Sequence, residues 1–376
     1  MKKFLFIFIS FYISQVAISQ NEKIFNAVDK KLTEIWKNSK APGLSFSVVL
    51  ADGETKTFTR GFANIERKSE MTPDTKMLGG STGKVFYSVV ALQLIEEGKL
   101  QLDKPIYPAM KNYDWFLKIP NAKSLTVRNL MRHQTGIPRY VFNSDFQKDI
   151  HKDADRVWKP EELLAYIFDA KPEFEVGSNF AYSDTNYIIL CMLIQNITKN
   201  SIYDEVQKRV LDKAGLKNVV PQTKRKYKNI AQGYNATNDP FFPGLQFDEG
   251  GKSRYNLQFE WAGGGLVITT HDLAVLAKKI YGGEMFAPKL LDEYFKGVDA
   301  GRLGGQWGLA VHIQETPKGK TYGHSGYMPG YITNMAYDAT HKFSICYQVN
   351  TSDRARLSIF RDLPSIVQVI RDELNK

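Results

Sequence analysis

Strand-like patterns occur near both ends of the chain, and a long stretch with few of them lies between. Towards the amino terminus, apolar and polar residues alternate over residues 44–50, Asp52 and Gly53 make a two-residue turn, and residues 56–65 return as a second strand. Further strands are predicted over residues 265–269, 307–313, 321–324, 332–337 and 343–350. Because strands need neighbours to pair with, we expect the two ends of the chain to join in one sheet.

The region between the ends is predicted to be mostly helical. Apolar side chains recur at helical spacing in residues 24–36, and residues 363–374 read as a closing helix. Other helices are expected directly after Ser81 and over residues 125–131, 160–168, 184–197 and 202–214. The predicted fold class is therefore α+β, an α/β sandwich. In it, an antiparallel sheet formed from both chain ends has flanking helices and a mostly helical insertion at about residues 103–260.

The first residues are typical of a secretory signal. Met1, Lys2 and Lys3 precede an apolar run over residues 4–13, and the small residues Ala17 and Ser19 follow it. We interpret residues 1–19 as a signal peptide and residues 20–376 as one domain, so the protein is expected in the periplasm or outside the cell. The apolar run is short for a membrane helix, and no later stretch approaches the roughly 20 apolar residues of one, so no membrane span is predicted.

Charge and cysteine content limit the expected partners. The net charge is +10, and loss of Lys2 and Lys3 with the signal leaves +8, but the basic residues are scattered apart from a cluster at residues 224–228. Nucleic acid is therefore not an expected partner, and the histidines show no metal-binding spacing, so neither a metal nor another cofactor is predicted. Cys191 and Cys346 both lie in apolar segments, and either pairing or two buried thiols is compatible with the sequence.

Ser81 and Lys84 form an S-x-x-K motif at the start of a predicted helix. Residues i and i+3 share one helix face, so the lysine amine can lie beside the serine hydroxyl. A serine hydroxyl needs an adjacent proton acceptor to become a nucleophile, and a lysine can supply it. The helix start also offers free backbone N–H groups to a developing oxyanion.

Two later motifs extend this pattern. Tyr182, Ser183 and Asp184 precede a predicted helix, and the run 323–326 (GHSG) lies in strand-like sequence. With these three motifs in order, the chain resembles the class C β-lactamase-like serine hydrolases, which include D-alanyl-D-alanine carboxypeptidases and esterases of the penicillin-binding-protein fold. Segments 92–105, 130–138 and 262–273 also look like their counterparts in that family.

The resemblance implies a role for each motif. Ser81 would be the acylated nucleophile, Lys84 the group that accepts or relays its proton, and Tyr182 the phenol that carries a proton to the leaving atom. The backbone N–H groups of Ser81 and Tyr327 would hold the oxyanion. His324, in the third motif, is counted with the catalytic residues, and Asp184, Ser325 and Gly326 with those around the substrate and oxyanion. The implied substrate is a small molecule or peptide with an ester or amide bond.

Two departures from the family pattern affect the expected chemistry. Asp184 stands where Asn is frequent, and an aspartate near Lys84 would raise the pKa of the amine and shift the role of base to Tyr182. A tyrosine near two cations is in turn expected to have a lowered pKa. His324 stands where β-lactamases have Lys, and histidine is only partly charged near neutral pH. An ester or D-amino-acid peptide is thus a better candidate substrate than a β-lactam.

Two other interpretations remain open. Gly79 to Gly83 also satisfy G-x-S-x-G, the nucleophile elbow of α/β-hydrolases, with Ser81, Asp184 and His324 in the expected order, although the polar, proline-containing residues 72–76 do not suit the buried strand that an elbow requires. Alternatively, the chain is a non-catalytic homologue that binds peptidoglycan or a protein partner. Specificity is expected in the loops over residues 139–160 and 227–261. His133 and His271 are expected to be structural, and the oligomeric state is not predicted.

Overall fold

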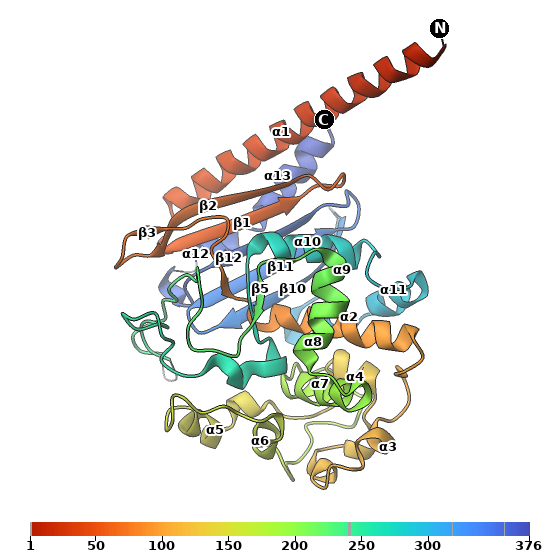
Figure 1. The fold of residues 1–376 in the computed structure, drawn as a ribbon, viewed down its shortest axis with the longest axis vertical. Helices are drawn as coiled ribbons and strands as arrows, with labels where there is room; N and C mark the ends of the chain where they lie inside the picture. The colour runs from red at the N-terminus through yellow and green to blue at the C-terminus, as the bar shows by residue number, and fades with distance from the viewer. Residues whose placement is uncertain (1, 240–241, 318, 357) are drawn as a thin grey trace.

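A large antiparallel sheet forms the centre of the computed structural model, which describes residues 2–239, 242–317, 319–356 and 358–376, with side chains from Gln20 onward. In these residues the sheet has nine strands in the order β3-β2-β1-β12-β11-β10-β9-β8-β7 (Figure 1). The strands are β1 (Gly43–Val49), β2 (Thr55–Asn64), β3 (Ser69–Glu70), β7 (Val298–Asp299), β8 (Gln306–Trp307), β9 (His312–Thr316), β10 (Gly319–Met328), β11 (Tyr331–Asp338) and β12 (Ser344–Val349).

The two ends of the chain meet at the β1–β12 pair in the middle of this sheet. Phe46 of β1 is opposite Tyr347 of β12, and their rings stack with centroids 5.9 Å apart. All seven residues of β1 are buried, because helices cover both faces of the sheet here. The predicted α+β fold, with a sheet formed from both ends, is confirmed.

One predicted strand is wrong in its middle. The sequence predicts a continuous strand over residues 307–313, but the chain reverses there, and Trp307 of β8 pairs with His312 of β9. The Gly308 N–H donates to the Val311 carbonyl at 2.8 Å, and Ala310 has a φ of 69°. A left-handed alanine is uncommon, and alternation of apolar residues does not reveal it.

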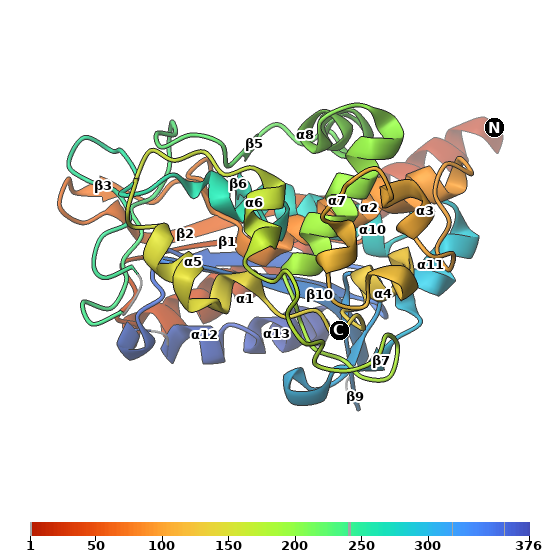
Figure 2. The same ribbon diagram turned by 90° about the horizontal axis from the view of Figure 1, so that it is seen from below.

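Helices cover the two faces of the sheet (Figure 2). On one face lie α1 (Lys2–Lys37), α12 (Ser358–Asp362) and α13 (Ser365–Leu374); on the other lies α10 (Thr270–Tyr281). The first face is held by one apolar cluster, which includes Ile24, Val28 and Leu32 of α1, Phe46 and Val48 of β1, and Ile366 and Ile370 of α13. The side chains of residues 1–19, for which a signal peptide is predicted, lie outside the described part of the chain.

Further helices and a small sheet complete the fold on the side of α10. The helices are α2 (Gly83–Glu96), α3 (Tyr107–Met110), α4 (Val127–Met131), α5 (Ser144–Asp149), α6 (Pro160–Ala165), α7 (Thr185–Thr198), α8 (Ile202–Val206), α9 (Asp212–Ala214) and α11 (Pro288–Phe295). The small sheet contains β4 (Met77–Leu78), β6 (Leu266–Ile268) and β5 (Val219–Pro221). Both α2 and α7 are buried along most of their length, which fixes the two segments that carry the predicted motifs. Among the described residues, no helix is long and apolar enough to cross a membrane.

Candidate active site

Ser81 lies in a tight turn that touches strand β10. The turn, a 3₁₀ segment over Gly80–Thr82, leads directly into α2. Gly80 has a φ of 53°, and a Cβ atom there would lie 2.7 Å from the backbone nitrogen of Tyr327. Only glycine allows this approach, which brings the start of α2 and the end of β10 together. The pairing of β10 with β9 stops at Gly323, so the rest of β10 runs past Ser81 without a strand on that side.

Lys84 is fully buried, and its ammonium group has three acceptors. Its Nζ atom lies 3.0 Å from Ser81 Oγ and 2.7 Å from Asp184 Oδ1, and it also donates to the Gly263 carbonyl. The carboxylate and the carbonyl can only accept hydrogen bonds, whereas a hydroxyl can also donate. Among these three hydrogen bonds, only the one to Ser81 joins Lys84 to a group that can also donate a proton.

Asp184 joins Lys84 to a second cation, Arg139. Arg139 donates to Asp184 Oδ2 from Nε at 2.9 Å and from Nη2 at 2.6 Å. Burial would raise the pKa of Asp184, but the charges of Lys84 and Arg139 outweigh it and lower that pKa. For Lys84, burial alone would lower the pKa of the amine. The negative charge of the nearby Asp184 outweighs this effect, so the pKa of Lys84 is raised overall. The prediction that Asp184 lies near Lys84 and raises the pKa of its amine is confirmed.

Tyr182 lies beside the two cations but is not ionised by them. Its ring centroid is 5.2 Å from Lys84 Nζ and 5.4 Å from the Arg139 guanidinium carbon. Its hydroxyl is buried and forms no hydrogen bond of regular geometry with any described residue, although Ser81 and Lys84 lie near enough to interact with it. Burial raises the pKa of Tyr182, and the charge of Lys84 offsets only part of that rise. The predicted lowering of this pKa is wrong because loss of solvent outweighs the two cations, so the resting group is a neutral phenol.

His324 is also neutral. Its Nδ1 donates to the Ser325 carbonyl at 2.6 Å, and its Nε2 has no hydrogen-bond partner among the described residues. Burial, followed by the charge of Lys84, lowers the pKa of His324 to about 3. The expected partial charge near neutral pH is therefore wrong, because the sequence does not show that this strand residue is enclosed. The His324 ring lies edge-on to Tyr182, with centroids 6.4 Å apart.

The remaining third-motif residues lie along β10. The side chain of Ser325 is exposed, whereas Gly326 is buried where a Cβ atom would lie 2.0 Å from the Gly79 carbonyl oxygen. Tyr327 is 55 % exposed and lines the cavity next to Ser81. The strand thus places the Tyr327 backbone beside the turn that carries Ser81, as the predicted oxyanion role requires.

The geometry contradicts the α/β-hydrolase triad of Ser81, Asp184 and His324. Ser81 Oγ contacts Lys84, while His324 is bonded to the neighbouring Ser325 carbonyl. Asp184 pairs with two cations instead of orienting a histidine. The central sheet is antiparallel throughout its pairings, which does not suit the parallel strand and elbow of that fold.

Several residues at the site were not predicted to belong to it. His133 was expected to be structural, and it supports Tyr182: the two rings are 4.1 Å apart, and His133 Nδ1 accepts from the Ser183 N–H at 3.2 Å. Arg139 was contained only in a loop expected to affect specificity. Glu260 was likewise contained only in the loop over residues 227–261, and Gly263 only in the family-like segment 262–273. Their contacts depend on segments far apart in the sequence. His271, also expected to be structural, lies at the start of α10 with its Nδ1 atom 3.0 Å from Asp272 Oδ1.

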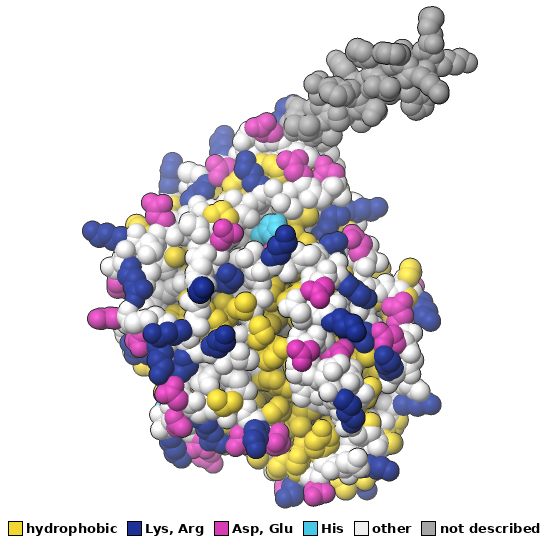
Figure 3. Space-filling view, in the orientation of Figure 1, with side chains coloured by type: hydrophobic (Ala, Val, Ile, Leu, Met, Phe, Trp, Pro, Cys, Tyr) yellow, Lys and Arg dark blue, Asp and Glu magenta, His cyan; other side chains and the backbone are white. Residues whose placement is uncertain are grey.

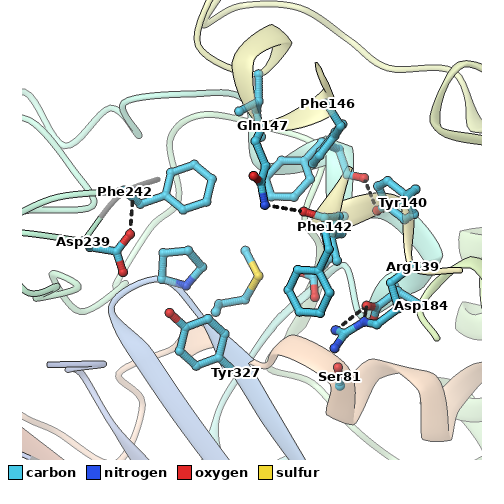
Figure 4. Close-up of a pocket in the computed structure, with 17 residues that line it drawn as sticks. Ser81, Arg139, Tyr140, Phe142, Phe146, Gln147, Asp184, Asp239, Phe242 and Tyr327 are labelled. Carbon is cyan, nitrogen blue, oxygen red and sulfur yellow. Dashed lines mark hydrogen bonds and ion pairs between the residues drawn. The ribbon is translucent and has the colours of Figure 1, made fainter. Parts of the chain in front are cut away.

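A cavity of about 350 Å³ opens next to Ser81 (Figure 4). Its lining is mainly aromatic and aliphatic, and comes largely from the two loops that were expected to set specificity. The lining residues are Ser81, Arg139, Tyr140, Val141, Phe142, Phe146, Gln147, Ile150, Asp184, Asp239, Phe242, Phe259, Glu260, Gly263, Tyr327, Met328 and Pro329. Figure 4 shows the rings of Phe142, Phe146 and Phe242 around this space, with Ser81 at one side near the start of α2.

Two further predictions concern the cysteines and metal binding. Cys191 in α7 and Cys346 in β12 are both buried and unpaired, which answers the question of whether they form a disulfide. In the described ranges, no group of His, Cys, Asp or Glu side chains is arranged to hold a metal ion. Basic and acidic side chains are interspersed over the face shown in Figure 3.

Comparison with known proteins supports the resemblance found in the motifs. Teichoic acid D-alanine hydrolase of Staphylococcus aureus is 26 % identical over 282 residues, which cover 73 % of this chain and 64 % of that protein. The match thus spans less than two thirds of the length of these curated relatives.

Two solved structures share the fold. D-amino acid amidase from Ochrobactrum anthropi SV3 has a TM-score of 0.78 at 23 % identity, covering 94 % of this chain and 99 % of that one. D-stereospecific amidohydrolase from Streptomyces sp. has a TM-score of 0.75 at 20 % identity, covering 90 % and 97 %. The family model described as Beta-lactamase matches residues 28–362. A match over this much of the sequence, on the fold and motifs described above, shows that the chain belongs to the Beta-lactamase family.

Proposed function

We propose that this protein is a serine hydrolase that cleaves an ester or amide through an acyl-enzyme on Ser81. The observation that carries the proposal is the surrounding of Lys84 Nζ. Two of its hydrogen-bond directions are occupied by Asp184 and Gly263, and the third faces Ser81 Oγ at 3.0 Å. A lysine held in this way is placed to accept the proton of the nucleophile, and the adjacent Tyr182 hydroxyl is near enough to interact with both groups.

These contacts support the following sequence of proton transfers. In the fraction of molecules with neutral Lys84, Ser81 Oγ attacks the substrate carbonyl carbon and gives its proton to Lys84 Nζ. The neutral Tyr182 phenol protonates the leaving atom as its bond to the acyl carbon breaks, and Lys84 then returns a proton to the phenolate. Water hydrolyses the acyl-enzyme by the reverse transfers. Backbone N–H groups of Ser81 and Tyr327 stabilise the oxyanion in both steps.

The cavity supports a substrate whose acyl group is apolar and bulky. Phe142, Phe146, Phe242 and Phe259 border the space beside Ser81. Burying an aromatic side chain among such residues contributes on the order of 2 kcal/mol to binding. Relatives named as D-amino acid amidase and D-alanine hydrolase favour a D-aminoacyl ester or amide. The neutral state of His324 makes a β-lactam, with its carboxylate, a poorer substrate.

A hydrolysis panel tests this proposal. It compares p-nitrophenyl acetate, D-phenylalanine amide, a D-alanyl-D-alanine peptide and a chromogenic cephalosporin, with Ser81→Ala as the control. We expect the ester to be cleaved fastest and the cephalosporin slowest, with all activity lost in Ser81→Ala. A fluorophosphonate adduct at Ser81 would support the acyl-enzyme. Failure to hydrolyse any of these and to form the adduct would favour the non-catalytic, peptidoglycan-binding or partner-binding alternative.

We also propose that the protein is exported to the periplasm or beyond, on the basis of the signal-like residues 1–19. Amino-terminal sequencing of the protein recovered from periplasmic and medium fractions tests this. A mature chain that starts shortly after Ser19 supports export, and a cytosolic chain that retains Met1 contradicts it.

A further inference from the structure

Glu260 is a buried carboxyl group that borders the cavity of Ser81 and that the mechanism above does not use. It is 7 % exposed and belongs to the 3₁₀ segment Leu257–Gly263. The same segment ends at the Gly263 carbonyl, which accepts a hydrogen bond from Lys84. Glu260 is therefore only three residues from Gly263, so a movement of Glu260 can shift one of the three acceptors of Lys84.

The turn that connects Glu260 to Gly263 is strained. Trp261 has φ 36° and ψ −112°, which no regular helix or strand contains. A Cβ atom on Gly264 would lie 2.4 Å from Glu260 Oε1, so the carboxyl group is packed against the backbone of its own turn. Such a conformation persists only where surrounding contacts hold it.

Gln222, the residue directly after β5, supplies those contacts. Its side-chain amide donates to Glu260 Oε2 at 3.0 Å and to the Leu257 carbonyl at 3.0 Å, while its backbone N–H donates to the Gly265 carbonyl at 2.8 Å. Gln222 itself is completely buried. The Gln222 amide thus donates to the Glu260 carboxylate from a fixed position next to β5. Together with its bonds to the Leu257 and Gly265 carbonyls, it connects both ends of the turn.

We propose that Glu260 is a positioning residue whose carboxylate, braced by Gln222, holds the turn that presents the Gly263 carbonyl to Lys84. The inference rests on the proposed hydrolase function and deepens it. Glu260 acts through Gly263 and Lys84, and forms no bond to substrate in this role. The groups that face the Glu260 carboxyl are N–H donors, which an ionised carboxylate can accept from. A protonated carboxyl carries an O–H donor of its own, which would point at these donors and weaken the hydrogen bonds.

The dependence of the turn on the ionisation of Glu260 can be measured because none of its charged or titratable neighbours among the described residues changes charge near neutral pH. Lys84 and Tyr87 of α2, Asp184 before α7, Tyr203 of α8, and Tyr140 and Tyr255 of the loops all interact with it electrostatically. Each of the four tyrosines has a raised pKa and stays neutral, Lys84 has a raised pKa, and Asp184 a lowered one. Burial raises the pKa of Glu260 itself to about 7, against the opposing charge of Lys84. Among these described neighbours, Glu260 alone titrates near neutral pH.

The experiment follows kcat/KM for a non-titrating ester between pH 5.5 and 9.5. For the wild type, the plot of log(kcat/KM) against pH should be steeper below about pH 7 than above it, because acid removes both neutral Lys84 and ionised Glu260. Glu260→Gln should follow one slope throughout, with kcat lowered about tenfold above pH 7 and KM nearly unchanged. Gln222→Leu, which removes a donor to the carboxylate, should move the break to higher pH.

The matched control is Glu205→Gln, which alters another buried carboxylate that pairs with Arg209 away from the cavity. It should keep the break of the wild type. A break that persists unchanged in Glu260→Gln, or that stays in place in Gln222→Leu, would overturn the proposal for Glu260 while leaving the hydrolase intact. Absence of any hydrolysis in the wild type would instead remove the proposed function. If Glu260→Gln does not fold, Gln222→Leu alone decides.

Discussion

The Lys84 ammonium and the Asp184 carboxylate form an ion pair of 2.7 Å that is almost fully shielded from solvent. Lys84 has no exposed side-chain surface, and the Asp184 side chain is 9 % exposed. Removing one partner of such a pair leaves a buried charge without compensation. This pair therefore connects the chemistry at Ser81 with the stability of the whole domain.

Asp184→Asn should destabilise the protein by about 3 kcal/mol, since the amide cannot balance the charges of Lys84 and Arg139. The pKa of Asp184 is lowered on folding, so its contribution to stability is present above its unfolded pKa of 3.8 and is lost as pH falls towards the folded pKa. The difference between wild type and variant should be constant from pH 5 to 8 and shrink below about pH 4. Urea unfolding at several pH values measures this. A difference that grows on acidification would contradict it.

Lys84→Ala should lower the rate of Ser81 acylation by about 10²–10⁴, the usual effect of losing a general base. The rate of labelling by a fluorophosphonate measures acylation directly. Lys99→Ala is a matched control, because Lys99 is an exposed lysine paired with Glu97 beyond the end of α2. Nearly full labelling of Lys84→Ala would show that another group deprotonates Ser81.

Tyr182→Phe should lower kcat by about 10²–10³ while leaving stability almost unchanged. The phenol donates a proton in the proposed mechanism, but its buried hydroxyl forms no regular hydrogen bond with the described residues, so its removal leaves no partner unsatisfied. Steady-state kinetics and thermal unfolding of the same preparation separate the two effects. Wild-type kcat in this variant would exclude Tyr182 as the proton donor.

Phe142→Ala should raise KM for a phenylalanyl ester about tenfold and change KM for an acetyl ester little. Phe142 lines the cavity and is 66 % exposed, so the substitution removes apolar contact with the substrate without opening the core. Val157→Ala is a suitable control because Val157 is equally exposed and does not line the cavity. Equal changes in KM for both esters would argue against an acyl group bound beside Phe142.

The local sequence determined the parts of this protein that depend on short spacings. Ser81 and Lys84 lie one helical turn apart, and that separation alone places the amine beside the hydroxyl. Strand patterns near both termini required a shared sheet, and β1 and β12 pair as expected. The loop residues 308–311 were the local exception, because the left-handed conformation of Ala310 leaves no mark in an apolar pattern.

Tertiary structure decided the charges at the site and the residues that support them. Whether Tyr182 and His324 are ionised depends on how much water the surrounding elements exclude, and the sequence does not record that exclusion. Arg139 and Gly263 reach the pair of Lys84 and Asp184 only because α2, α7 and two loops pack together. Motif spacing therefore identified the candidate reacting groups that the structure brings together, whereas their protonation states follow from burial and from contacts between distant segments.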